Sequence, residues 1–284
     1  MINKTDIYEK SGYLNSDFKI FHLTYAKTEE IPFHYHDFHK ILIFIHGNIN
    51  YNIEGRSFRL LPDDIVFVHA GDVHRPELTK HSDYERIIIY ISEHYIHSFE
   101  QRCFSSNLHF SLSDFSSNVL RPSMHTNANL IHTIYRLHDA VSENEFGSEL
   151  YKEAVFSEFF VLLVRAVLKN MIEFGDMISC DEKLFHIIDY INTHLTEDIH
   201  IDTLASSLYL SRSRLMHFFK EKTGASLGQY ISNKRLILAR HLIESGCSRT
   251  EACFQCGYKN YSTFTRAYNK QLKNLCSYDK DSSS

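Results

Sequence analysis

The sequence lacks any segment that could export the chain or hold it in a membrane. Its first fourteen residues contain no apolar core of the kind that a secretory signal needs. The most apolar stretch, 159–168, is too short to span a bilayer and contains Arg165. We therefore expect a cytoplasmic protein that makes no membrane contact.

A disulfide framework and tryptophan are also missing. The six cysteines are scattered over 284 residues without the spacing of a disulfide-rich domain, which indicates a reducing compartment. Hydrophobic residues make up 43% and charged residues 23% of the chain, as in ordinary soluble globular proteins. The length suffices for about two domains, each with its own core.

Basic residues are scarce in the first part of the chain and concentrated in the last. Residues 1–180 carry a net charge of −8, whereas residues 181–284 carry +3. Within the latter, residues 203–273 hold twelve Lys or Arg against three Glu, a local charge of +9. Such an excess in a chain of net charge −5 favours a polyanion partner, and we predict double-stranded DNA.

Short β-branched and aromatic runs dominate residues 17–92. They are separated by turn signals that contain Gly, Pro, Asn or Asp, with no gap long enough for a helix. Evenly spaced short strands predict a sandwich or a closed barrel. Residues 93–126 show no clear period, and we expect irregular structure there with short strands that close the barrel. The clearest strand runs are 18–23, 41–45, 65–68 and 87–91.

Histidines near these strands could serve three purposes. If one strand runs unbroken through residues 34–44, His34, His36 and Lys40 share a face, because strand side chains alternate. His74 comes from a later strand, and together the three histidines have the pattern of a metal site. They could also line a pocket that hydrogen-bonds a small polar effector, or be structural residues of a half-buried strand.

The period changes to that of helices at residue 127. Apolar residues then recur every three or four positions through 130–141 and again through 151–171, which predicts a helical pair. The stripe on the second helix is wider than one neighbour requires. We expect the pair to mediate dimerisation; a purely intramolecular core is the alternative.

A helix-turn-helix pattern follows an amphipathic segment at 183–195. Asp202 is expected to cap a helix at 203–208, and Ser211 to cap the next one at 212–222, which ends before a glycine. The second helix of such a motif presents its N-terminal residues to the major groove of DNA.

A long helix at 226–245 separates this unit from a second one. Residues 248–256 and 260–272 repeat the helix-turn-helix pattern, with Gly257 and a tyrosine at the turn. The chain therefore has two candidate recognition helices joined by a helical spacer.

Sequence motifs in this region identify a family. Phe-Phe-Lys-Glu-Lys-Thr-Gly at 218–224, Arg-Leu-x-x-Ala-Arg-x-Leu-Ile at 235–243 and Gly-Tyr-x-x-x-Ser-x-Phe-x-Arg-x-Tyr at 257–268 fall in register. Over about residues 184–273 the chain resembles the DNA-binding domain of AraC-family transcription regulators. The resemblance implies that the long helix sets the two recognition helices about one DNA turn apart on one face of the duplex.

The resemblance is weaker in the second unit. The family usually has a Gly and, three residues later, a Pro after the second recognition helix, where this chain has Lys273 and Cys276. Ala252 and Cys253 replace the usual Ile-Ala pair. We therefore expect the first unit to carry more of the sequence specificity. Cys253 and Cys256 form a C-x-x-C, which could be a zinc or redox site or two small buried residues.

Two N-terminal stretches, PFHYHDFHKILIFIHG and LLPDDIVFVHAGDVHRPEL, resemble the two motifs of the cupin barrel. Metal-binding cupins supply two His and a Glu from the first motif and a His from the second. Lys40 stands where that Glu would be and opposes a metal ion. The resemblance therefore implies a barrel without metal or cofactor, and a sugar as the class of effector.

The predicted fold is α+β, with an N-terminal cupin-like barrel and a C-terminal all-α domain. The expected parts are an effector-sensing barrel at 1–126, a helical dimerisation pair at 127–175, a linker at 176–182, a double helix-turn-helix domain at 183–274 and a polar tail at 275–284.

The predicted function is that of a transcription activator, a homodimer that binds promoter DNA, responds to a small effector and contacts RNA polymerase. No catalytic residues are predicted. The alternatives are a cupin-type metalloenzyme and a constitutive DNA-binding protein whose barrel only dimerises. The candidate effector-binding residues are His34, His36, Lys40, His74 and Arg86. The candidate DNA-binding residues are Arg212, Ser213, Arg214, Met216, His217, Lys220, Lys222, Lys259, Tyr261, Ser262, Thr263, Thr265, Arg266 and Lys270.

Overall fold

The protein divides into two units by its internal contacts. The computed structural model describes residues 9–10, 14, 16–25, 31–78, 83–103, 115 and 117–276. We call residues 14–31 and 38–180 the sheet unit, and residues 1–13, 32–37 and 181–284 the helical unit. Of the predicted tail, residues 277–284 lie outside the described residues.

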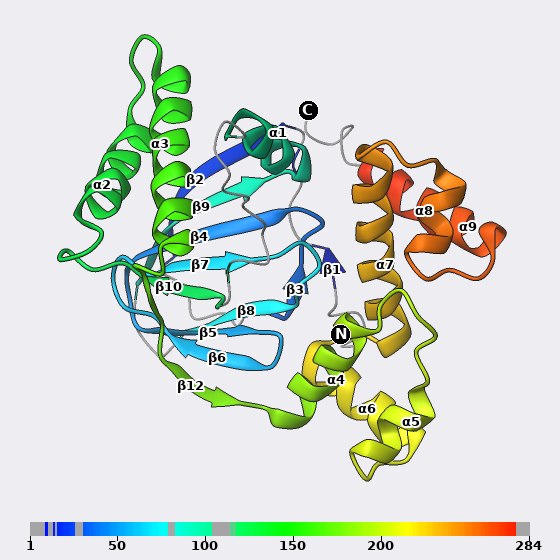
Figure 1. Cartoon of the computed structure of the whole chain (residues 1–284). Coiled ribbons are helices and arrows are strands. Elements are labelled where there is room, and N and C mark those ends of the chain that lie inside the picture. Colours follow the sequence, from blue (N-terminus) through cyan, green and yellow to red (C-terminus); the bar gives the residue numbers. More distant parts are fainter. Residues whose placement is uncertain are drawn as a thin grey trace, which may run out of the picture. The chain divides into compact units, whose positions relative to one another are not determined.

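The sheet unit is built around two groups of antiparallel strands (Figure 1). One group has the order β8-β5-β6-β12, and the other has the order β11-β10-β7-β4-β9-β2. The strands are β2 (Phe18–Tyr25), β4 (His39–His46), β5 (Ile49–Ile53), β6 (Arg56–Arg59), β7 (Ile65–Val68), β8 (His74–Leu78), β9 (Tyr84–Ile91), β10 (Val119–Arg121), β11 (Glu173–Phe174) and β12 (Met177–Cys180).

Alternation along the strands creates two cores. In β4, Leu42 and Phe44 join an inner core with residues of β5 and β6, so side chains of both sheets pack together there. Ile41 and Ile43 point to the opposite face and join an outer core. The β4 strand is buried on both faces, which explains why its sequence is an almost continuous apolar run.

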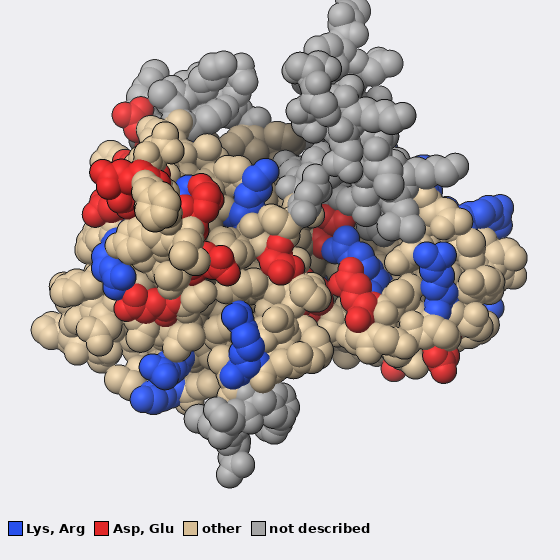
Figure 2. All heavy atoms as spheres, turned by 90° about the horizontal axis from the view of Figure 1, so that it is seen from above, with Lys and Arg blue, Asp and Glu red and all other residues tan. Residues whose placement is uncertain are grey.

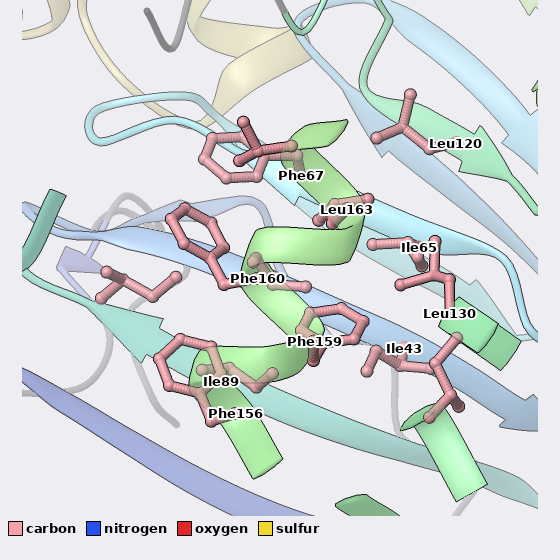
Figure 3. Packing of buried hydrophobic residues seen from close by; sticks show 14 of the residues in the cluster. Ile43, Ile65, Phe67, Ile89, Leu120, Leu130, Phe156, Phe159, Phe160 and Leu163 are labelled. Carbon is pink, nitrogen blue, oxygen red and sulfur yellow. The ribbon is translucent and has the colours of Figure 1, made fainter. Parts of the chain in front are cut away.

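Helices cover the outer face of the second sheet. They are α1 (Glu93–Cys103), α2 (Ala128–Ser142) and α3 (Ser148–Leu168). Side chains of α3, including Phe156, Phe159 and Phe160, lie against Ile43 and Ile89 of the sheet (Figure 3). Each fully buried side chain of this size contributes about 1.5–3 kcal/mol to folding, so this layer contributes much of the unit's stability.

Three expectations for this part of the chain were wrong. Residues 93–103 form helix α1 instead of irregular structure, because Tyr95, Ile96 and Phe99 pack into the outer core. The unbroken strand through residues 34–44, which was the condition for His34, His36 and Lys40 to share a face, is interrupted at 36–38, between β3 and β4. The segment 176–182, expected to be a linker, contains β12, which pairs with β6.

The helical unit contains both predicted helix-turn-helix motifs. Its helices are α4 (Glu182–Thr193), α5 (Ile201–Ser207), α6 (Arg212–Thr223), α7 (Leu227–Glu244), α8 (Arg249–Gln255) and α9 (Tyr261–Cys276). A short parallel pair of strands, β1 (Glu9–Lys10) and β3 (His34–Tyr35), groups with them. Among the described residues, no helix is both long and apolar enough to cross a membrane.

Local capping sets the ends of these helices. Ser211 accepts a hydrogen bond from the backbone of α6, as predicted, and Gly224 ends that helix at φ +78°. Ser226 and Ser248 begin α7 and α8 with capping boxes. The predicted cap at Asp202 was wrong: α5 begins one residue earlier, at Ile201 with His200 as its N-cap, so Asp202 lies in the first turn.

The two helix-turn-helix turns have the same backbone hydrogen bonds. The amides of Tyr209 and Leu210 bond to carbonyls of α5 as those of Gly257 and Tyr258 bond to carbonyls of α8. Both Tyr209 and Gly257 have positive φ, +55° and +88°. The first turn therefore places a tyrosine in a left-handed conformation that usually favours glycine.

Candidate functional site

The first candidate recognition surface is the exposed face of α6. Leu215 and Phe219 are buried and hold the helix, and the Phe219 ring packs edge-on against Tyr230 of α7 with centroids 5.3 Å apart. The residues predicted to contact DNA, all polar or charged except Met216, lie on the other side and are exposed. They are Arg212, Ser213, Arg214, Met216, His217, Lys220 and Lys222.

The second candidate surface is the corresponding face of α9. Phe264 and Tyr268 are buried in a core that also contains Cys253 and Cys256. Thr265 is half-buried, and its hydroxyl has no hydrogen-bond partner among the described residues. The other predicted DNA contacts of this unit are exposed: Lys259, Tyr261, Ser262, Thr263, Arg266 and Lys270.

Several of the predicted DNA-binding cations already have an acidic neighbour. The Arg212 guanidinium lies 2.8 Å from Asp202, and the Lys222 ammonium lies 2.9 Å from Asp181. Lys259 donates to Asp198, which lowers the pKa of that carboxyl. Sequence reasoning missed these aspartates, because they lie 10 to 61 residues away from the cations that they meet.

Acidic and basic side chains are also mixed on the face of the molecule that Figure 2 shows. On the face seen in Figure 2, lysines and arginines stand apart from one another instead of forming one broad patch. Charge complementarity to DNA therefore depends on where particular side chains lie on α6 and α9.

Arg235 of α7 has a structural role. It donates to the carbonyls of Leu195 and Glu197, over 2.8 Å and 2.7 Å, and thereby fixes the loop before α5 to the long helix. The Cβ that a side chain at Gly257 would carry meets the Arg235 guanidinium at 3.0 Å. Arg235 thus holds the loop before α5 to the spacer, and its guanidinium lies 6.0 Å from the centre of the Tyr258 ring in the second turn.

The two cysteines of the C-x-x-C motif are core residues. Cys253 and Cys256 are fully buried, and the Cys256 thiol donates to the Cys253 carbonyl over 3.3 Å. Burial raises the pKa of both thiols, that of Cys256 to about 11, so both remain protonated at neutral pH. This environment fits small buried residues better than a reactive thiol pair.

A polar cluster lies on the inner faces of the sheet unit, which we call the inner cluster: Lys40, Tyr51, His74, Tyr84 and Arg86. All of these residues are buried. The Lys40 ammonium donates to the Tyr51 hydroxyl over 3.1 Å and lies 3.4 Å from His74 Nε2. The His74 ring stacks on Tyr51.

The partners of His74 indicate its tautomer. Its Nδ1 lies 2.9 Å from the Asp72 carbonyl, which can only accept, so Nδ1 carries a proton. In the neutral ring Nε2 is then an acceptor that faces Lys40. The structure thus brings together three predicted effector-binding residues, Lys40, His74 and Arg86.

Burial gives the inner cluster unusual acid–base properties. Desolvation, and then the nearby charge of Arg86, lowers the pKa of Lys40 to about 7. Burial raises the pKa of Tyr51, Tyr84 and Tyr90, so these phenols stay neutral donors. The Arg86 guanidinium covers the Tyr84 ring, 4.1 Å from its centre, and the Tyr84 hydroxyl has no hydrogen-bond partner among the described residues.

Sequence reasoning missed the tyrosines of this cluster. Tyr51 and Tyr84 occur in ordinary strand sequences, and their position depends on strand register. The signal that could have found them is alternation: Tyr84 lies two residues before Arg86, and so on the same face of β9.

His34 and His36 belong to the segment 32–37, which groups with the helical unit. Their rings pack edge to face, with centroids 5.2 Å apart, and His34 Nδ1 lies 2.9 Å from the Pro32 carbonyl. In the same segment the Asp37 carboxylate accepts a 2.8 Å hydrogen bond from Arg240 of α7.

Comparison with known proteins gives two consecutive domain matches. The AraC-like ligand binding domain matches residues 21–160, and a helix-turn-helix domain matches residues 204–277. Together the two ranges cover most of the chain.

Curated proteins align with this chain over most of its length and of their own. The chain is 24% identical over 242 residues to the HTH-type transcriptional activator RhaS of Escherichia fergusonii, covering 85% of this chain and 84% of that protein. It is 23% identical over 248 residues to RhaS of Escherichia coli O1:K1, covering 86% and 85%.

Among solved structures, an apo crystal structure of ToxT from Vibrio cholerae aligns with 90% of this chain and 94% of its own, at 17% identity and a TM-score of 0.40. The two domain matches and the curated relatives show that this chain belongs to the AraC family of DNA-binding transcription regulators, with an N-terminal ligand-binding domain and a C-terminal helix-turn-helix domain.

Proposed function

We propose that this protein is a transcription activator that binds promoter DNA through α6 and α9 and responds to a small polar effector bound at the inner cluster. The observation that carries the DNA-binding role is that two helix-turn-helix motifs each hold a recognition helix by buried residues and expose its polar face.

Within these surfaces we assign separate roles to the cations. Arg212, Arg214 and Arg266 are the best candidates to read guanine, because a guanidinium can donate two hydrogen bonds to the O6 and N7 atoms of that base. Phosphate contacts position the protein on the duplex and carry no sequence information. We assign them to Lys220, Lys222, Lys259 and Lys270.

The chemistry of the inner cluster defines the class of effector. Lys40, Arg86 and the tyrosine hydroxyls offer several hydrogen-bond donors in a buried setting. A ligand rich in acceptor oxygens suits these donors, and we propose a sugar, with a sugar acid suited best because two cations lie near each other. The assignment of His34 and His36 as effector contacts stays a prediction from the sequence.

The proposed activation, location and oligomeric state rest on other observations. Activation, with contact to RNA polymerase, is proposed because the curated relatives are named transcriptional activators. We also propose that the protein works in the cytoplasm, without a metal at the predicted effector residues and without catalysing a reaction. A homodimer is proposed on the exposed apolar residues near the turn between α2 and α3.

The DNA-binding role is tested by gel shift with the full-length chain and DNA from upstream of its own gene. Arg214→Ala should weaken specific binding about 5- to 150-fold, since a bidentate arginine–guanine pair is worth about 1–3 kcal/mol. It should also relax base preference at one position of the site. Lys169→Ala, which removes an exposed cation after α3, is the matched control and should bind as the wild type does. Absence of DNA binding by the wild type at low salt would refute the proposal.

A further inference from the structure

Two histidines and a glutamate meet on the outer side of the sheet unit, apart from the inner cluster. They are His22 of β2, Glu85 of β9 and His138 of α2. One potential ligand atom of each lies within 4.8 Å of those of the other two. Neither the DNA-binding surface nor the predicted effector contacts make use of them.

The distances between these atoms are near those of a metal site. His22 Nε2 lies 2.8 Å and His138 Nε2 lies 3.6 Å from the same oxygen of Glu85, Oε1. Ligands held about 2.0–2.1 Å from zinc at tetrahedral angles are about 3.3 Å apart. Small side-chain rotations would therefore place all three ligands around one ion.

The backbone explains how the three residues come together. His22 is paired with Ile87 in the antiparallel register of β2 and β9, so Glu85 lies diagonally opposite on the same face. Helix α2 packs against β2 and supplies His138. Its neighbours Ile134 and Leu137 are buried in the outer core, which fixes the helix at this position.

The imidazole rings of His22 and His138 are oriented so that both can offer a nitrogen to one ion. They lie edge to face, with centroids 4.6 Å apart. His138 Nε2 is buried and makes no hydrogen bond among the described residues, although its ring points toward Glu85. His138 Nδ1 lies 3.4 Å from Asp139, a carboxylate placed to orient the ring.

The charge and the solvent exposure of the three side chains also fit a metal site. Glu85 adds a carboxylate to two histidines, and this combination of charge and nitrogen donors suits a divalent cation. The three side chains keep between 24% and 32% of their surface exposed, which leaves a path for an ion to enter. Two histidines and a glutamate are a known ligand set for zinc, with a fourth position left to water.

We propose that His22, Glu85 and His138 form a zinc-binding site that fastens α2 to β2 and β9. The sequence alone predicted no metal site and no cofactor, and only His34, His36 and His74, beside Lys40, were weighed as ligands there; the proposed site departs from that prediction. Because the ion would hold side chains of three elements together, the stability of α2 should depend on available zinc.

Zinc content of the full-length chain, without purification tag, tests the proposal. Protein is stripped with chelator, equilibrated with Zn²⁺ at neutral pH, passed through a desalting column and analysed for metal. Because other histidines can also hold zinc, the readout is the difference between variants. His138→Ala, His22→Ala and Glu85→Gln should each retain one equivalent less than the wild type. His132→Ala, which removes an exposed histidine from the same helix, should retain the wild-type amount.

Two further readouts separate a specific site from loose binding. Zinc should raise the melting temperature of the wild type and of His132→Ala, and raise it less in the three site variants. With Co²⁺ in place of zinc, the wild type should show the intense visible bands of a four-coordinate site, absent from Glu85→Gln. That variant keeps the size of the side chain, so a loss of binding there cannot be attributed to misfolding. Equal zinc content in the wild type and all three site variants, or no zinc retained by the wild type, would overturn the proposal.

Discussion

At the scale of single residues, two tyrosines of the inner cluster should respond differently to loss of their hydroxyls. The Tyr84 hydroxyl is buried without a partner among the described residues, whereas the Tyr51 hydroxyl accepts from Lys40. Tyr84→Phe should therefore leave the free energy of unfolding unchanged or raise it by up to about 1 kcal/mol. Tyr51→Phe should lower it, because Lys40 loses a buried partner.

The Tyr84→Phe variant also tests effector binding. A ligand that uses the Tyr84 hydroxyl should raise the melting temperature of the wild type and raise it less in Tyr84→Phe. A screen of sugars and sugar acids by thermal shift provides the measurement. If a ligand from this screen stabilises Tyr84→Phe as much as the wild type, Tyr84 is not an effector contact.

Lys40 should make stability depend on pH. Its pKa is about 7 in the folded protein and 10.5 when exposed, so the unfolded chain binds more protons between these values. The contribution of Lys40 to the free energy of unfolding therefore rises with pH across that window and is constant below it. In Lys40→Met this contribution is absent. Urea unfolding from pH 6 to 9 should show wild-type stability rising relative to Lys40→Met above pH 7; parallel curves would contradict the assignment.

At the scale of elements, two glycines with positive φ form a matched pair. Gly246 has φ +100° with open space at its Cβ position, while Gly257 has φ +88° and a Cβ there would lie 2.8 Å from the Leu195 carbonyl. Gly246→Ala should cost about 1 kcal/mol through backbone strain alone. Gly257→Ala should cost clearly more, because the second turn must also shift away from the loop. If urea unfolding gives equal losses of unfolding free energy for Gly246→Ala and Gly257→Ala, the loop that contains Leu195 moves to make room for the added Cβ.

The elements that could be predicted are those whose signals are local. The strand runs at 41–45 and 65–68 are continuous and β-branched, and α6 and α7 carry their own caps and apolar spacing. Helix α1 was missed because its burial depends on α3, whose Phe156 and Phe160 contact Tyr95. Strand β12 is short and largely exposed, and exists only through pairing with β6.

The candidate sites also divide into those that one segment of sequence predicts and those that depend on contacts between distant segments. The exposed faces of α6 and α9 could be derived from helical spacing and motif order, which are properties of one segment. The inner cluster depends on register between strands, so Lys40 and Arg86 could be named but Tyr51 and Tyr84 could not. His22, Glu85 and His138 come from three distant segments, and nothing in the sequence around any one of them indicates the other two.

At the scale of the whole molecule, the proposed dimer has a specific candidate surface. Phe146 and Leu150, at the turn between α2 and α3, are strongly exposed, and Tyr151, the next residue along α3, is 42% exposed. Exposed apolar residues gathered in this way are typical of a protein interface. The rest of α3 is largely buried within the sheet unit, which leaves this end as the part available to a second copy.

Leu150→Asp should convert the dimer to a monomer in sedimentation experiments, because an interface cannot bury an unpaired charge without a large cost. Met124→Asp is the control: it places the same charge on another exposed apolar residue of the sheet unit, before α2, and should remain dimeric. A wild type that sediments as a monomer at micromolar concentration would show that this surface has another use.

The ion pairs on the helical unit have a consequence for how strongly salt affects the protein on DNA. Lys222 and Lys259, both assigned to phosphate contacts, each lie beside an aspartate of the same chain, so part of their charge is already neutralised before DNA arrives. A phosphate that takes over such a cation must first displace its carboxylate. Fewer counterions are then released for each contact made, and the dependence of the binding constant on salt is shallower than the twelve lysines and arginines at 203–273 would suggest. The release of counterions also drives non-specific binding to DNA of any sequence. By reducing that contribution, these aspartates should favour binding to the operator over binding to the rest of the chromosome.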